Sequence, residues 1–333
     1  MNYIEDEQIF LSEFELQWRS FIEGVQISQV QLSIGNRLRP RLVRWGYLAA
    51  TAGENISYVL PASMALSIEA IHKASLLLDD WIDNDDGRHG QPAFHVQFSP
   101  YETIMTALHL VNASLHRHLA LREDTDTPAL HGKSWRDFII DTLYHMSLGA
   151  LNELRLNEKS IIDVKVVKKI SEFETYRILG NALQLGYYTG RGNHDEVYKL
   201  FEKIGDGCGY IFQAFNDFEA YGNSVKLSGH KGCVNYDINK KRKNLCVAIL
   251  YDVASAKDKK AIEALSALDL LSLMGKYRIK DFLMEEAEMT FKFIRQWIVE
   301  LTGYGISSEW GLQFSCFLSN LRKQVATKLS AND

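Results

Sequence analysis

Residues 72–90 of this chain read HKASLLLDDWIDNDDGRHG, an apolar helical run that ends in a cluster of acids. Asp79 and Asp83 are four residues apart, so a helix places them on one face. Five aspartates between 79 and 86 repel one another unless a cation lies among them. Mg²⁺ prefers oxygen ligands and is often bound through one or two carboxylates plus substrate phosphates. Arg88 follows, and its paired donors suit a phosphate oxygen. The stretch therefore indicates a Mg²⁺ site for a phosphorylated substrate, and a merely solvated acidic loop is the alternative.

The composition excludes several classes of protein. The chain has 333 residues, of which 46% are hydrophobic and 24% charged, which is ample for a large core. A net charge of −5 argues against a nucleic-acid binder. Four cysteines without a CxxC pair indicate reduced thiols, and the acidic N-terminus resembles no targeting peptide. No apolar run approaches the roughly 18 residues of a membrane span. We therefore expect a cytoplasmic, soluble protein.

The distribution of prolines and apolar residues predicts an all-α fold. Four of the five prolines lie in the first third, and the long stretches between them show apolar residues at spacings of three and four. Residues 142–154, 176–188 and 209–221 are clear examples, whereas strand signals are nearly absent. We expect a single helical domain over residues 1–333, with a mobile tail after about residue 325.

A second acidic patch and two basic stretches contribute to the predicted site. Asn216 and Asp217 lie in FQAFNDFEAY, and two acidic helix faces across a bundle core can hold several Mg²⁺ ions around one diphosphate. Residues 229–244, GHKGCVNYDINKKRKN, and residues 34–45, IGNRLRPRLVRW, are basic. A helix N-terminus beside arginines suits an anion, although a solvated basic surface explains either stretch equally well. His72 lies two turns before Asp79, either as a core residue or as a ligand contact.

In these motifs the chain resembles the trans-isoprenyl diphosphate synthase (polyprenyl synthetase) family, as a divergent member. GNRLRP (35–40) is similar to GGKRLRP, and residues 72–95 follow the DDxxD motif with its xxDxRRGxP continuation. FQAFNDFEA (212–220) resembles FQxxDDxxD, and residues 231–245 resemble GKxxGxDxxxGKxT. The resemblance implies an isoprenoid-synthase-type bundle of antiparallel helices around a deep central cavity. It also implies a homodimer, three Mg²⁺ ions and an allylic isoprenyl diphosphate as substrate.

The resemblance carries roles to individual residues. It implies that Asp79, Asp80 and Asp83 are catalytic metal ligands and that Arg88 contacts the allylic diphosphate. Asn216 and Asp217 complete the implied metal site. The remaining implied substrate contacts are Arg39, His72, His89, Phe212, Gln213, Lys231 and Arg242.

Departures from the family pattern fall mainly on the part of the site that binds isopentenyl diphosphate. Asn36 and His89 replace a lysine and an arginine there. The second motif ends in Ala220 instead of aspartate, with Glu219 beside it. The lysine of the family's KT pair falls at Ile178, beside Arg177, and the GQxxDL stretch carries Ala150 and Glu153 in place of its glutamine and aspartate.

Three functions fit this combination. The default is a Mg²⁺-dependent prenyltransferase that ionises an allylic diphosphate and condenses it with isopentenyl diphosphate or another acceptor. A class I terpene cyclase that releases diphosphate without isopentenyl diphosphate is the first alternative, and a non-catalytic partner subunit is the second. The resemblance implies that bulky side chains four or five residues before the first aspartate shorten the cavity. Ser75 and Ala74 stand at these positions and are small, so we expect a pocket for a chain of about 20 carbons or longer.

Overall fold

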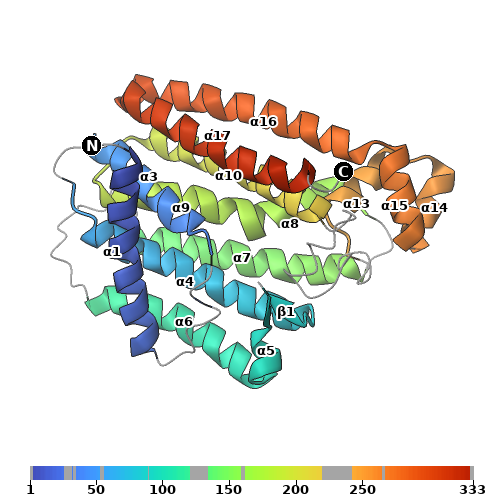
Figure 1. The fold of residues 1–333 in the computed structure, drawn as a ribbon, viewed down its shortest axis with the longest axis horizontal. Helices are drawn as coiled ribbons and strands as arrows, with labels where there is room; N and C mark the ends of the chain where they lie inside the picture. Colours follow the sequence, from blue (N-terminus) through green and yellow to red (C-terminus); the bar gives the residue numbers. More distant parts are fainter. Residues whose placement is uncertain are drawn as a thin grey trace.

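Long helices lie side by side along most of the chain in this computed structural model (Figure 1). The structure describes residues 3–25, 32, 35–52, 56–88, 90–120, 134–158, 162–219, 242–264 and 267–330. Its helices are α1 (Tyr3–Gly24), α3 (Leu38–Thr51), α4 (Val59–Ile82), α5 (Phe94–Gln97), α6 (Pro100–Ala120), α7 (Trp135–Asn157), α8 (Val164–Ser171), the π-helix η1 (Glu172–Tyr176), α9 (Arg177–Thr189), α10 (Asp195–Glu219), α13 (Leu245–Val253), α14 (Ala256–Ala264), α15 (Ala267–Lys276), α16 (Ile279–Leu301), the 3-10 turn η3 (Thr302–Tyr304) and α17 (Ser308–Ser330). The predicted all-α fold is confirmed.

A single small hairpin interrupts the helices within the described ranges. Strand β1 (Gly87–Arg88) pairs antiparallel with β2 (Gln91–Pro92), directly after α4. The hairpin turns the chain back at the end of α4, and Figure 1 shows it at the edge of the bundle. Arg88 is thereby held next to the aspartates that precede it.

Helices α3 and α9 pack closely against each other at two glycines. A Cβ atom on Gly46 would collide with the Leu183 carbonyl, and one on Gly186 would collide with the Val43 carbonyl. Glycine at these two positions lets the backbones approach, because any side chain would hold the helices apart. The large core around this contact includes residues of α1, α4, α10, α16 and α17.

Three of the four arginines in residues 34–45 connect α3 and the residue before it to α1 through ion pairs. Each makes an ion pair with an acid of α1, and the pairs are Arg37 with Glu15, Arg41 with Glu7 and Arg44 with Asp6. Arg37 and Arg44 are almost fully buried, so these pairs belong to the fold. Removing one partner of such a buried pair costs about 3–5 kcal/mol. Because the other three arginines are paired with α1, Arg39 is the arginine of this stretch to which the predicted anion-binding role still applies.

Other predictions from composition can be compared with the described residues. Each helix in the described ranges is too short or too polar to cross a bilayer. Cys208, Cys246 and Cys316 are free thiols, and Cys233 lies outside the described residues. Helix α17 extends to Ser330, and the predicted mobile tail stays a prediction.

Candidate active site

The acidic cluster lies at the C-terminal end of α4. Asp79 and Asp80 are in its last turn and Asp83 is its C-cap, where the Asp83 N–H donates to the Asp79 carbonyl at 2.8 Å. Asp80 is buried, whereas 42% of the Asp79 side chain is exposed. A helix C-terminus carries partial negative charge and disfavours acids. Cations are therefore needed to hold these carboxylates together.

Arg88 supplies the first of these cations from the hairpin. Its Nε donates to both carboxylate oxygens of Asp80 at 2.8 Å, and one terminal nitrogen donates to Asp79 Oδ2 at 3.3 Å. Burial lowers the pKa of Arg88, but the hydrogen bond and charge of Asp80 outweigh burial, so that the pKa lies above its ordinary value. The guanidinium is thus fully charged beside the acids.

Arg242 supplies the second cation from a distant part of the chain. It makes an ion pair with Asp83, three residues before α13 begins. Burial lowers the pKa of Arg242, while the charges of Asp79 and Asp80 act in the opposite direction. The fold therefore brings the two predicted arginines, Arg88 and Arg242, to one acidic helix end.

The second acidic patch is arranged differently. Asp217 is buried on α10, where its Oδ1 accepts from Gln213 Nε2 and its Oδ2 accepts from the Leu245 N–H, both at 2.7 Å. Gln213 Oε1 in turn accepts from the Thr175 hydroxyl at 2.8 Å. Asn216 is exposed. Asp217 thus fixes the start of α13, and the metal-binding roles of Asn216 and Asp217 stay predictions.

The remaining predicted contacts of this half of the site are only partly described. Phe212 packs toward α16 and α17, beside Phe291 and Leu318. Lys231 and His89, like Ala220, lie outside the described residues. Ala74 is buried in the core and Ser75 is half-buried on α4, and the predicted pocket length stays a prediction.

Arg39 and His72 lie far apart in the sequence, but in the structure they are within electrostatic reach of each other near the middle of α4. Burial and the positive charges of Arg39 and Lys73 lower the pKa of His72 well below its ordinary value, so its imidazole is neutral. Asn36 lies at the turn before α3, where its Oδ1 accepts from the Leu38 N–H at 3.1 Å. Lys73 is within electrostatic reach of both Arg39 and His72, although its position in the sequence had not identified it as a candidate site residue.

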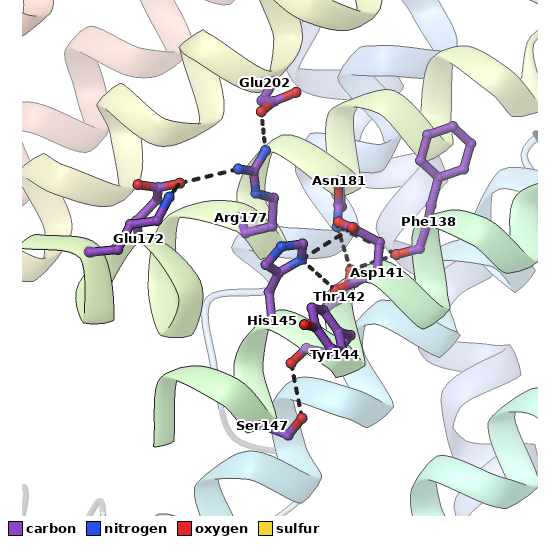
Figure 2. A network of polar contacts seen from close by, with 11 residues as sticks. Phe138, Asp141, Thr142, Tyr144, His145, Ser147, Glu172, Arg177, Asn181 and Glu202 are labelled. Carbon is purple, nitrogen blue, oxygen red and sulfur yellow. Dashed lines mark hydrogen bonds and ion pairs between the residues drawn. The ribbon is translucent and has the colours of Figure 1, made fainter. Parts of the chain in front are cut away.

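The next predicted departure from the family pattern is Ile178, at the position of a family lysine. Ile178 is fully buried in the core, and Arg177 makes ion pairs with Glu172 and Glu202 (Figure 2). The π-helix η1 precedes these residues, and its wider turn changes the face on which each one lies. Residue spacing in an ideal helix cannot anticipate this change.

A buried carboxyl group of η1 faces the acids instead. Burial and the charges of Glu153, Asp79 and Asp217 raise the pKa of Glu174 well above its ordinary value. Glu174 also packs against α7, where a Cβ atom on Gly149 would meet its Cγ atom at 2.5 Å. Three carboxyl groups from α4, α7 and α10 therefore lie within electrostatic reach of Glu174, and sequence reasoning had assigned no role to Glu174.

Figure 2 shows the polar contacts between Asn181 of α9 and residues of α7. Asn181 of α9 donates from Nδ2 to Asp141 Oδ2 at 3.0 Å and to the Thr142 hydroxyl at 2.8 Å. On the same helix, His145 Nδ1 lies 2.9 Å from the Asp141 carbonyl oxygen. These bonds hold α7 against α9, and hence Glu153 opposite Glu174.

The donor set at the end of α4 fits Mg²⁺. The groups are hard carboxylate oxygens, of which Asp79 is the most accessible. In the described part of the chain, no group of three His, Cys, Asp or Glu side chains is arranged so that these side chains alone could hold a metal ion. An open carboxylate edge suits Mg²⁺, which usually completes its octahedron with water and substrate phosphate oxygens.

The fold and the site together define a class: an all-α bundle in which an acidic helix end, flanked by arginines, can bind metal ions and a phosphorylated ligand. The family model described as Polyprenyl synthetase matches residues 25–269, and the chain belongs to this family.

Comparisons with individual proteins agree with this membership. A geranylgeranyl diphosphate synthase of Methanosarcina mazei is 27% identical over 55% of this chain, and the chain spans only 54% of that relative. A geranylfarnesyl diphosphate synthase of Aeropyrum pernix is 24% identical over 69% of this chain and 70% of its own length. Among solved structures, a decaprenyl diphosphate synthase from Rhodobacter capsulatus superposes with a TM-score of 0.78 at 16% identity, covering 96% of this chain and 98% of its own. The structural similarity shows the fold.

Proposed function

We propose that this protein is a Mg²⁺-dependent prenyltransferase that ionises an allylic isoprenyl diphosphate and condenses it with isopentenyl diphosphate or another acceptor. The observation that carries the proposal is the convergence of Arg88 and Arg242 on the aspartates at the end of α4. Such an arrangement of acids and paired-donor cations suits a metal-bound diphosphate better than it suits a purely structural contact.

Each group has a role in the proposed reaction. Asp79, Asp80 and Asp83 would hold Mg²⁺, with Asn216 and Asp217 as further ligands. The ions, three by analogy with the family, would supply positive charge that stabilises the departing diphosphate. Arg88 and Arg242 lie within reach of the same diphosphate and exchange carboxylate partners for its oxygens. The C–O bond to the diphosphate breaks and the diphosphate leaves with the electron pair. The acceptor's double bond then attacks the allylic cation to form a C–C bond, and loss of a proton from the adduct gives the new double bond.

The identity of the product is open within this proposal. The names of similar proteins specify geranylgeranyl, geranylfarnesyl and farnesyl diphosphate synthases, at 23–27% identity. These names differ in chain length, so they support diphosphate chemistry and leave the length of the product undecided. A terpene cyclase is the second candidate, favoured by Asn36, which stands where the family has a lysine and accepts from the Leu38 N–H, and by the carboxyl pair Glu153–Glu174 near the acids.

A homodimer is part of the proposal. Helices α6 and α7 each expose one stripe of large apolar side chains, with exposed fractions between 50% and 82%. The stripes are Tyr101, Met105 and Leu108 on α6 and Ile140, Tyr144 and Leu151 on α7. Large exposed apolar stripes are typical of protein interfaces, and a second copy of this chain is the proposed occupant. Sedimentation of wild type against Met105→Glu tests it, and a monomeric wild type would contradict it.

One assay tests the proposed activity. Purified protein is incubated with Mg²⁺ and geranyl, farnesyl or geranylgeranyl diphosphate, with and without isopentenyl diphosphate. A longer prenyl diphosphate supports the proposal, and a hydrocarbon formed without isopentenyl diphosphate supports the cyclase. Absence of turnover in every combination would exclude both enzymes and leave the partner subunit.

A further inference from the structure

The short segment that leads into α13 contacts three different helices. Arg242 makes an ion pair with Asp83 at the end of α4. The Leu245 N–H, three residues later, donates to Asp217 Oδ2 of α10 at 2.7 Å. Lys243 lies between these two residues in the sequence, and its side chain contacts a third helix, α7. The segment is thus fixed at several points, and one of them directly follows Arg242.

The contact between Lys243 and α7 is buried. The ammonium donates to the backbone carbonyl oxygens of Leu156 at 2.8 Å and Asn157 at 2.9 Å, in the last turn of α7. Carbonyls at this end of a helix lack a partner within the helix and carry partial negative charge, so they suit a cation. Only 9% of Lys243 is exposed, and burial lowers its pKa. An apolar side chain would pack here without the cost of burying a charge, so the directional contact best explains the lysine.

Arg242 depends on such contacts because its backbone is irregular. Residues 242–244 belong to no helix or strand. The hydrogen bonds of a helix therefore do not set the direction of the Arg242 side chain, and contacts of neighbouring residues must do so. The contact of Lys243 with α7 is adjacent to Arg242 in the sequence, whereas that of Leu245 is three residues away. A displacement of about 1 Å at a reacting group can cost about a hundredfold in rate.

Lys243 itself has no place in the motif that residues 231–245 resemble. Arg242 stands at the last lysine of GKxxGxDxxxGKxT, and Lys243 stands at the next position, which the motif leaves open. The contact with α7 is therefore a feature of this chain that the resemblance does not assign.

We propose that Lys243 is a positioning residue for Arg242. By binding the C-terminal end of α7, Lys243 holds the backbone at Arg242 where the guanidinium reaches Asp83 and, in the reaction, the metal-bound diphosphate. Lys243 acts through Arg242 and not by its own contact with the substrate. This inference rests on the proposed prenyltransferase function and adds a residue on which that site depends.

Kinetics of Lys243→Met test the inference, because methionine keeps the length of the stem and removes the ammonium. The kcat/KM for the allylic diphosphate should fall about 10-fold, while the KM for the acceptor stays within about twofold. Lys243→Arg, which can donate to the same carbonyls, should retain most of the activity. If Lys243→Met does not fold, Lys243→Gln, which keeps a donor without the charge, takes its place in every comparison.

A double-mutant cycle with Arg242→Met distinguishes positioning from a structural role. In the Arg242→Met background, adding Lys243→Met should lower kcat/KM by less than about twofold, because the group that Lys243 positions is already gone. A structural defect would instead multiply the loss in both backgrounds. Equal losses with and without Arg242, or an unchanged kcat/KM in Lys243→Met, would overturn the inference and leave the prenyltransferase proposal intact.

Asp163→Ala is the matched control for a loss of stability. Asp163 caps α8, where its Oδ1 accepts from the Lys165 N–H at 2.8 Å, away from the proposed site. This variant should lower the melting temperature, as Lys243→Met does, but leave kcat/KM unchanged. An equal fall of kcat/KM in Asp163→Ala would attribute the effect of Lys243 to stability and overturn its positioning role.

Failure of the proposed function has a separate outcome. If wild type turns over no allylic diphosphate, that function fails, and calorimetric titration with Mg²⁺ and inorganic diphosphate decides the inference. Weaker binding by Lys243→Met than by wild type, with no such difference in the Arg242→Met background, supports the positioning role. Any other result of the titration overturns it.

Discussion

The ends of α4 and α10 both carry aspartates, but the structure uses them in opposite ways. At the end of α4 the carboxylates are paired with the side chains of Arg88 and Arg242. At the end of α10 the carboxylate of Asp217 accepts from a backbone N–H and from Gln213 on its own helix. The first set of partners can transfer to a phosphate, because arginine side chains can exchange a carboxylate for a phosphate oxygen. The second set defines where α13 begins.

This difference predicts that the end of α4 serves catalysis, whereas Asp217 at the end of α10 contributes to stability. We expect variants at the end of α4 to lose activity while remaining folded, and variants of Asp217 to lose stability as well. The following predictions test that separation.

The largest effect is expected for the double variant Asp79→Ala, Asp80→Ala. Without these oxygens neither Mg²⁺ nor Arg88 is held, so diphosphate release should fall by at least about a thousandfold. Release of inorganic diphosphate measures it, with Asp281→Ala on α16 as an exposed control. Retained turnover would refute the metal assignment.

Arg88→Lys should have the next largest effect. Lysine keeps the charge but loses the two-pronged contact with Asp80, so kcat/KM for the allylic diphosphate should fall about 10- to 100-fold. The melting temperature should change little. An unchanged kcat/KM would mean that Arg88 merely neutralises Asp80.

Asp217→Asn should lower the free energy of unfolding by about 1–2 kcal/mol. The amide of asparagine accepts through one oxygen, so either the Leu245 N–H or Gln213 loses its acceptor. Asp79→Asn, by contrast, should change stability by less than about 0.5 kcal/mol. Urea unfolding of both variants measures the contrast, and equal losses would show that the two helix ends do not differ.

The smallest effect is expected at Asp206, which lies away from both helix ends. Burial raises its pKa to about 7, with the nearby charges of Glu202 and Glu172 acting in the same direction and Arg177 opposing them. Between about pH 4 and pH 7 the folded protein keeps a proton that the unfolded chain has lost, so stability declines as the pH rises through this range. Asp206→Asn should remove that decline, by about 1–2 kcal/mol at pH 8. Parallel decline in both proteins between pH 5 and pH 8 would contradict this.

Local pattern predicted much of the fold and one half of the site. The spacing of Asp79 and Asp83 predicted a shared helix face, and the low proline content predicted helices. These features depend on neighbours a few residues away, which a sequence displays directly.

The parts that could not be predicted depend on contacts between distant segments. Arg37, Arg41 and Arg44 read as a possible anion site, but α1 supplies their partners. Glu174 was missed because a π-helix moves it toward the acids, and Lys73 was missed because its neighbours Arg37 and Arg39 come from another helix. Such contacts between distant segments cannot be predicted from the spacing of residues within one helix.

Product analysis after incubation with Mg²⁺, farnesyl diphosphate and isopentenyl diphosphate is the most direct test of the central claim. Wild type should form a longer prenyl diphosphate, and Asp79→Ala, Asp80→Ala should form none. If wild type releases no inorganic diphosphate from this or a shorter or longer allylic substrate, the acidic end of α4 is not a prenyltransferase site.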